Sequence, residues 1–169
     1  WFAVDEADSD PDRFIRYVVA AVRTLAPEFG ADIERLLSSP QLPPPEYLTD
    51  AILNALAAID QPLLIVFDDY HRITSRTVNK IMARMLQYLP EKLHVLLLTR
   101  KDPPFPLGLW STRQWLAELR AADLRFDLAE GGAFLNDVMG LELTESDVAA
   151  LEDRTEGYES VEPAALARA

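Results

Sequence analysis

The chain has 169 residues, of which 49% are hydrophobic and 26% charged, a balance typical of one globular domain that excludes global disorder. Its 16 Lys and Arg against 28 Asp and Glu give a net charge of −12, which argues against a surface that grips nucleic-acid phosphates. Cysteine is absent, so disulfide bonds and sites built on thiolates are excluded, and no apolar run approaches the roughly 20 residues that cross a membrane.

The first third of the chain is mainly helical in pattern. Trp1–Val4 is a short apolar run that fits either a strand end or a tail. Asp10 and Pro11 then supply an N-cap acceptor and a proline at the first helical position, and apolar residues follow at three-and-four spacing as far as Leu25. Further helices are expected at about 32–37 and 46–59. They are separate helices, because the prolines between them break a helix.

Two continuous apolar runs predict strands that are buried on both faces of a parallel sheet. The run 63–67 ends at Asp68 and Asp69, and the run 94–99 ends at Arg100. An amphipathic helix at about 78–86 separates them, which is the βαβ pattern. We therefore expect adjacent parallel strands with a right-handed connection.

A proline cluster at 103–106 marks the best internal boundary, so we divide the chain into domains at 1–104 and 105–169. Beyond it the pattern predicts a helix at 109–119, a short strand at 124–126 and a helix from about Ala129. A last helix runs through Leu151 and begins at the capping box formed by Thr144 and Asp147. Residues 157–169 are ambiguous, because a proline would interrupt a helix there.

Asp68, Asp69 and Arg100 are the candidate site residues. Ligands of open α/β sheets bind beyond the carboxyl ends of the strands, where two carboxylates can hold Mg²⁺ and orient an attacking water. An arginine on the next strand can reach a γ-phosphate. The alternatives are solvated carboxylates, and an arginine paired with a nearby acid such as Asp102. His71 can hydrogen-bond near a phosphate, or it can simply cap or pack.

Four ordered blocks carry a resemblance to a known family. They are residues 5–14 (DEADSDPDRF), 64–71 (LIVFDDYH), 98–104 (LTRKDPP) and 119–126 (LRAADLRF). They resemble the large ATP-dependent LuxR-type transcriptional regulators of the MalT-like class, which belong to the signal-transduction ATPases with numerous domains. The similarity continues through residues 134–141 and 154–157, so it covers most of the chain.

The resemblance implies an α/β fold: a P-loop NTPase-like parallel sheet flanked by helices, followed by the start of a helical and winged-helix lid. Asp68 matches the Walker B aspartate that binds magnesium, Asp69 the next acidic position, which acts in catalysis, and Arg100 the sensor arginine that faces the γ-phosphate of ATP. In such cytoplasmic regulators, ATP and a small-molecule or protein inducer favour self-association. A C-terminal helix-turn-helix then binds promoter DNA, and no membrane takes part.

The sequence departs from this family in a central element. No Gly-x-x-x-x-Gly-Lys-Ser/Thr motif occurs, so the lysine and backbone amides that cradle phosphates are missing, and so is the helix-turn-helix. We therefore expect an incomplete nucleotide core that lacks the P-loop strand, or a core completed by another chain or by residues outside this sequence. The chain begins with Trp1, which predicts a processed product, an expressed fragment or a piece of a longer protein.

The leading interpretation is part of the nucleotide-binding switch of a transcriptional regulator, with slow Mg²⁺-ATP hydrolysis as its chemistry. The alternative is a truncated relative that binds partners without nucleotide. A metabolic enzyme is disfavoured, because the sequence shows no second catalytic cluster and its two histidines anchor no Ser/His/Asp array.

Overall fold

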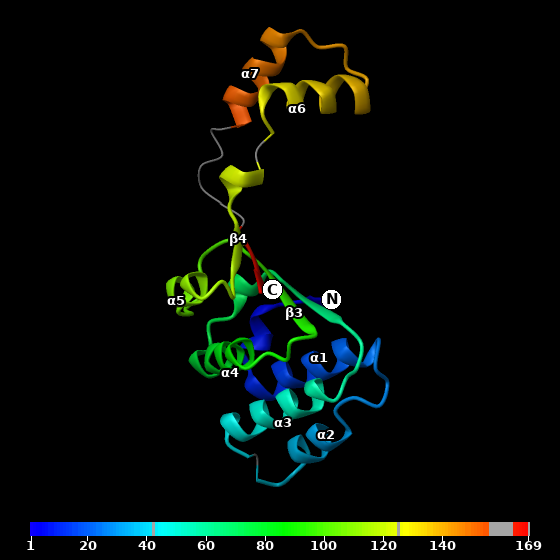
Figure 1. Ribbon diagram of the computed structural model, residues 1–169, viewed down its shortest axis with the longest axis vertical. Coiled ribbons are helices and arrows are strands. Elements are labelled where there is room, and N and C mark those ends of the chain that lie inside the picture. Colours follow the sequence, from blue (N-terminus) through cyan, green and yellow to red (C-terminus); the bar gives the residue numbers. More distant parts are fainter. Residues whose placement is uncertain (42, 125, 156–163, 169) are drawn as a thin grey trace. The chain divides into compact units, whose positions relative to one another are not determined.

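The computed structural model describes residues 1–41, 43–124, 126–155 and 164–168, and none of the helices found there is long and apolar enough to cross a membrane. The chain forms two compact units. The larger contains Trp1–Glu118 and the last strand, and the smaller begins at Leu119 (Figure 1).

The larger unit alternates strands and helices. Its elements are β1 (Phe2–Ala3), η1 (Glu6–Ser9), α1 (Pro11–Arg23), α2 (Ala31–Leu37), α3 (Pro45–Ala57), β2 (Leu63–Asp68), η2 (Tyr70–Arg72), α4 (Arg76–Gln87), β3 (Leu93–Thr99), α5 (Leu107–Thr112), β4 (Ala117–Leu119, which crosses into the smaller unit) and β5 (Ala164–Arg168). The helices predicted in the first ninety residues are confirmed. The Asp10 carboxylate accepts a hydrogen bond from the Arg13 amide at 2.9 Å, and Pro11 opens α1.

The sheet has the order β1-β2-β3-β5-β4. β1 and β3 both pair in parallel with β2, in a register that places Phe67 beside Phe2 on one side and beside Leu97 on the other. The predicted parallel pairing of the two apolar runs is therefore confirmed, with α4 between them in the chain, and the fold is α/β as expected.

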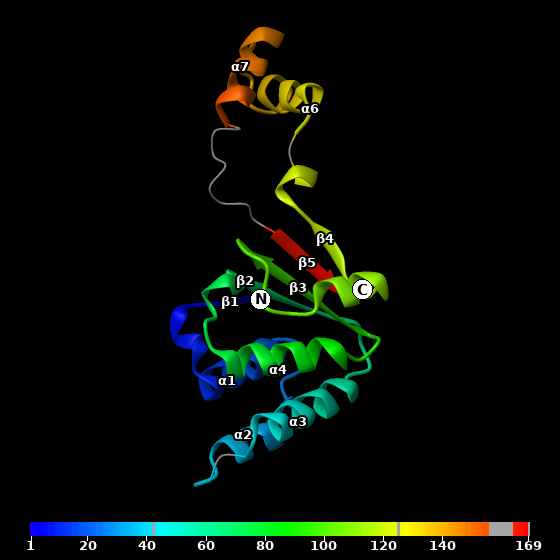
Figure 2. The same cartoon turned by 90° about the vertical axis from the view of Figure 1, so that its left-hand side faces the viewer.

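The expectation that these strands are buried on both faces is only partly right. α1, α3 and α4 lie on one side of the strands (Figure 2), and Ile65, Phe67 and Val95 are buried. On the other face Leu64 is 56% exposed and Leu98 is half-buried, whereas Val66 is buried. The second face of these strands is therefore covered only in part among the described residues, although the apolar runs are continuous.

The second edge of β3 is paired with β5, which runs antiparallel from Thr99↔Ala164 to Val95↔Arg168. A buried edge strand would leave backbone groups without partners, and this pairing satisfies them. Residues 157–169 are ambiguous in the sequence. Of these, 164–168 form this strand, and the rest lie outside the described residues.

Two predictions between residues 105 and 126 are wrong. The helix expected to run to residue 119 ends at Thr112, because Gln114 adopts a left-handed backbone (φ 58°) and a short strand, β4, follows. The strand expected at 124–126 is absent from its described positions: Leu124 lies in a 3₁₀ turn and Phe126 is in no strand, whereas residue 125 lies outside the described residues.

A continuous row of aromatic rings links the sheet to the segment beyond the proline cluster. Phe67 contacts Tyr70, Tyr70 contacts Phe105, and Phe105 contacts Trp110, with ring centroids 5.7–6.4 Å apart. Phe105 and Trp110 thus belong to the core of the larger unit. The division into domains at 104/105 stays a prediction, whereas the compact units of the structure divide after Glu118.

The smaller unit is helical and follows the predicted capping signals. Its elements are η3 (Ala121–Leu124), α6 (Leu128–Ala133), the π-helical turn η4 (Phe134–Val138) and α7 (Glu145–Thr155). The predicted capping box is confirmed: the Thr144 hydroxyl accepts from the Asp147 amide at 3.3 Å, and the Asp147 carboxylate accepts from the Thr144 amide at 3.1 Å.

A substitution at Gly30 tests the packing between the start of α2 and α1. Gly30 adopts φ +77°, and a Cβ placed on it would lie 2.6 Å from Cγ1 of the buried Val19. We expect Gly30→Ala to lower the free energy of unfolding by about 2–4 kcal/mol, from backbone strain plus overpacking. Gly108→Ala is the control, because it meets nothing within 4 Å in α5 and is expected to be neutral or slightly stabilising. Equal stability of the two variants in urea denaturation would contradict this packing.

Candidate functional site at the carboxyl ends of the parallel strands

The structure brings all three predicted site residues to one edge of the sheet. Asp68 is the last residue of β2, Asp69 follows it, and Arg100 follows the last residue of β3. Because β2 and β3 are parallel and paired up to Phe67↔Leu97, their carboxyl ends meet at the same edge. Arg100 is exposed and Asp68 is half-buried, so both side chains are open to a ligand from solvent.

The backbone turns sharply at Asp69. This residue adopts the left-handed conformation (φ 57°, ψ 34°), which costs a non-glycine residue free energy and is best tolerated by Asp and Asn. Tyr70 anchors the turn from below: it is buried, and its hydroxyl donates to Asn79 Oδ1 at 2.9 Å. Burial raises the pKa of the Tyr70 phenol, which therefore stays a neutral donor. The turn thus holds the Asp69 side chain 40% exposed at the edge.

Two groups face the Asp69 carboxylate. His71 Nδ1 lies 3.6 Å from Oδ1, and Arg72 Nε lies 3.4 Å from Oδ2. His71 Nδ1 is buried and has no hydrogen-bond partner, although a buried polar atom normally has one. The sequence left His71 open between a phosphate-side role and plain packing. The structure places it beside Asp69, at a distance longer than a hydrogen bond.

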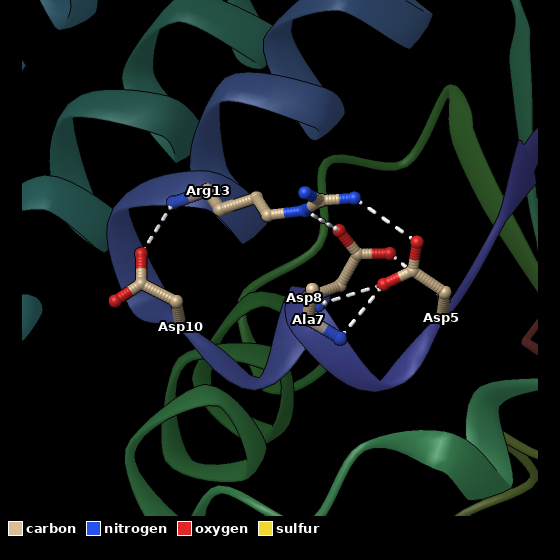
Figure 3. Close-up of polar contacts among 5 residues, drawn as sticks. All are labelled: Asp5, Ala7, Asp8, Asp10 and Arg13. Atoms are coloured by element: carbon tan, nitrogen blue, oxygen red, sulfur yellow. Dashed lines mark hydrogen bonds and ion pairs between the residues drawn. The ribbon is translucent and has the colours of Figure 1, made fainter.

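A second charged cluster lies directly after β1 at the same edge (Figure 3). The Asp8 carboxylate is 2% exposed and accepts from Arg13 Nε at 2.7 Å and from the Asp5 amide at 2.8 Å. Arg13 Nη2 donates to Asp5 Oδ2 at 3.0 Å. The hydrogen bond to Asp8 is the main cause that raises the pKa of the Arg13 guanidinium.

Residues on either side of this cluster connect the loops that follow β1 and β2. The Val4 amide donates to the Asp68 carbonyl at 2.9 Å, and Ser9 Oγ accepts from the Thr74 amide at 3.0 Å. From the sequence, this block predicted the helix start at Asp10 and carried a resemblance, but none of its residues was a candidate for the site. The available signal was a lone arginine among four aspartates immediately after an apolar run.

The carboxylates at this edge fit a Mg²⁺ site only if water or phosphate oxygens supply most of the ligands of the ion. The described residues contain no group of three or more His, Asp or Glu side chains that could hold a metal. Mg²⁺ binds through one or two protein carboxylates and keeps water or phosphate oxygens at its other positions, so Asp68 and Asp69 fit such a site. A groove of about 1070 Å³ lies along α2 and α3, and none of the three predicted site residues lines it.

Comparison with known proteins found no family model that matches the chain. Among curated proteins, the HTH-type transcriptional regulator MalT of Yersinia enterocolitica is 30% identical over 158 residues, and MalT of Serratia proteamaculans has the same identity. MalT of Yersinia pestis is 29% identical. Each match covers 94% of this chain and 18% of the relative, so the chain spans about a fifth of the length of the curated relatives it matches. The predicted resemblance to MalT-like regulators is confirmed.

A substitution at Asp8 tests whether the charged cluster stabilises this edge. We expect Asp8→Ala to cost about 2–3 kcal/mol of unfolding free energy, because a buried carboxylate that accepts two hydrogen bonds is lost. Asp12→Ala is the control: its ion pair with Arg16 is a surface pair on α1, and we expect a cost below about 1 kcal/mol. If urea denaturation gives the two variants equal stability, the cluster is not what fixes the loop after β1.

Proposed function

We propose, from its homology to a segment of MalT, that this chain is part of the Mg²⁺-ATP-dependent switch of a transcriptional regulator. The observation that carries the proposal is the shared edge: parallel pairing of β2 and β3 puts two carboxylates and an arginine at the carboxyl ends of adjacent strands. This is where open α/β sheets bind ligands.

The three residues have different roles in this proposal. Asp68 holds Mg²⁺, whose charge offsets that of the phosphate oxygens when the ion is bound. Asp69 accepts a hydrogen bond from the attacking water and orients it, and Arg72 Nε donates to the Asp69 carboxylate at 3.4 Å and so helps to position it. Arg100 contacts the γ-phosphate, which ATP has and ADP lacks, so it reports which nucleotide is bound.

The phosphate cradle would come from outside this chain. The sequence has no glycine-lysine loop, so we expect the chain alone to bind ATP weakly or not at all. The second face of β2 and β3 is only partly covered, with Leu64 exposed and Leu98 half-buried, so a further element of the longer protein could pack there. In the longer protein we propose that ATP and an inducer control self-association, and through it a separate DNA-binding domain.

A second candidate function is a nucleotide-independent interaction module. The missing glycine-lysine loop favours it, because without that loop the three edge residues have no phosphate to act on. In that case Asp68, Asp69 and Arg100 are solvated strand ends, and substitutions there leave nucleotide affinity unchanged.

We expect three distinct outcomes when the edge residues are changed in the protein that carries this segment together with a phosphate-binding loop. Asp68→Asn weakens magnesium-dependent ATP binding, because a charged ligand is lost while the shape is kept. Asp69→Asn leaves ATP affinity nearly intact and slows hydrolysis at least about tenfold, because water orientation acts on the transition state. Arg100→Ala reduces the preference for ATP over ADP. Calorimetry with both nucleotides and a turnover assay separate these effects.

Two matched controls lie away from the edge. Asp60→Asn removes a carboxylate just before β2, at the opposite end of the strand, and Arg35→Ala removes an exposed arginine of α2. Both are expected to match the wild type in every assay. If the three edge variants also match the wild type, the switch proposal loses its chemical basis and the interaction module is favoured.

A further inference from the structure

The described part of the smaller unit exposes more large apolar side chains than it buries. The exposed large side chains between residues 126 and 151 are Phe126, Leu128, Phe134, Val138, Met139, Leu141 and Leu151. Val138 is 72% exposed, whereas Val148, at 3%, is the only large hydrophobic side chain in this described stretch that is buried. Exposed apolar residues are ordinary when scattered, but a concentration of them on one short segment marks an interaction surface.

Three of these seven side chains lie on one helical stretch, and three more lie close to its ends. α6 continues directly into η4, so residues 128–138 form an uninterrupted helical segment with Met139 and Leu141 immediately after it. Phe126, just before the helix, stacks on Phe134 with ring centroids 5.5 Å apart, which extends the apolar surface backward along the segment. A helical surface of this kind is best covered by another helix, whose side chains pack between its own.

The charges on the same segment restrict the partner. Between residues 126 and 151 the sequence has six Asp and Glu and no Lys, Arg or His. Asp137, Glu142 and Glu145 are exposed beside or soon after the apolar residues. Nucleic acid and anionic lipid surfaces would be repelled, and a second copy of this unit would bring the same negative charge. A positively charged partner would be attracted.

We propose that this surface, residues 126–141, docks a basic amphipathic helix of a partner protein. Apolar residues of the partner helix cover Phe134, Val138 and Met139, and flanking lysines or arginines lie against Asp137 and Glu142. The surface belongs to the smaller unit, whereas Asp68, Asp69 and Arg100 belong to the larger one.

The test uses the full chain and a labelled 18-residue peptide of leucine and lysine with its leucines on one helical face. Fluorescence anisotropy is expected to give micromolar affinity. A scrambled peptide of the same composition, and a peptide with glutamate in place of lysine, are expected to bind at least tenfold more weakly. Backbone amide shifts are expected to change within residues 126–141.

Variants divide the apolar from the charged contribution. Val138→Ser with Met139→Ser is expected to weaken binding at least tenfold, and both positions are exposed, so the fold is retained. Asp137→Asn with Glu142→Gln is expected to weaken binding severalfold and to reduce its salt dependence. Leu25→Ser, which removes an exposed leucine of the larger unit, is the control and is expected to change nothing.

Several results would overturn the proposal. Equal binding of the scrambled peptide, equal affinity of all variants, absence of binding, or shift changes confined to the larger unit would each show that this surface does not recognise a basic helix. Sedimentation equilibrium measures whether the chain forms a dimer. A dimer that is abolished by Val138→Ser with Met139→Ser would assign the surface to a second copy of the chain.

Discussion

Parallel pairing of β2 with β3 is the constraint on which the rest of the structure depends. The strands pair from Leu63↔Leu93 to Phe67↔Leu97. Between the two strands, α4 returns the chain to the end of the sheet at which β2 begins. This return forces both strands to end at the same edge, and it places the residue after each strand near the other. The site is therefore a consequence of topology: Asp69 and Arg100 are thirty-one positions apart in the chain yet end neighbouring strands.

The loops at this edge are held by polar contacts, whereas the strands are held by apolar packing. Tyr70 combines both, because its ring lies in the aromatic row of the core and its hydroxyl donates to Asn79. After β1, the Asp8–Arg13 pair and the bond from the Thr74 amide to Ser9 have a similar effect at the surface. A left-handed Asp69 is tolerable in this setting, because the residues on either side of it are fixed.

Much of this arrangement could be predicted from the sequence, because the strong signals were local. The N-cap at Asp10 and the capping box at Thr144 both depend on neighbouring residues, and both are confirmed. The failures depended on distant contacts or on backbone conformation. No pattern in the chain shows that Leu64 is left exposed on β2, and none marks the left-handed turn at Gln114.

The site was predicted in part for the same reason. Strand ends rich in charge can be recognised in a sequence, and that identified Asp68, Asp69 and Arg100. Arg13 was missed because its importance comes from the burial of Asp8, which is a property of the folded loop. His71 could be named but not placed, because its distance to Asp69 depends on the turn between them.

The most direct test of the account is where a divalent cation binds on this chain. Mn²⁺ replaces Mg²⁺ and broadens nearby amide signals in NMR spectra, so a titration at physiological salt locates the ion. The account predicts that signals of residues 68–71 and 100 broaden first, and that Asp68→Asn removes the effect while Asp60→Asn does not. Broadening spread over the acidic surface, or unchanged in Asp68→Asn, would contradict the claim that the ends of β2 and β3 form a cation-binding edge.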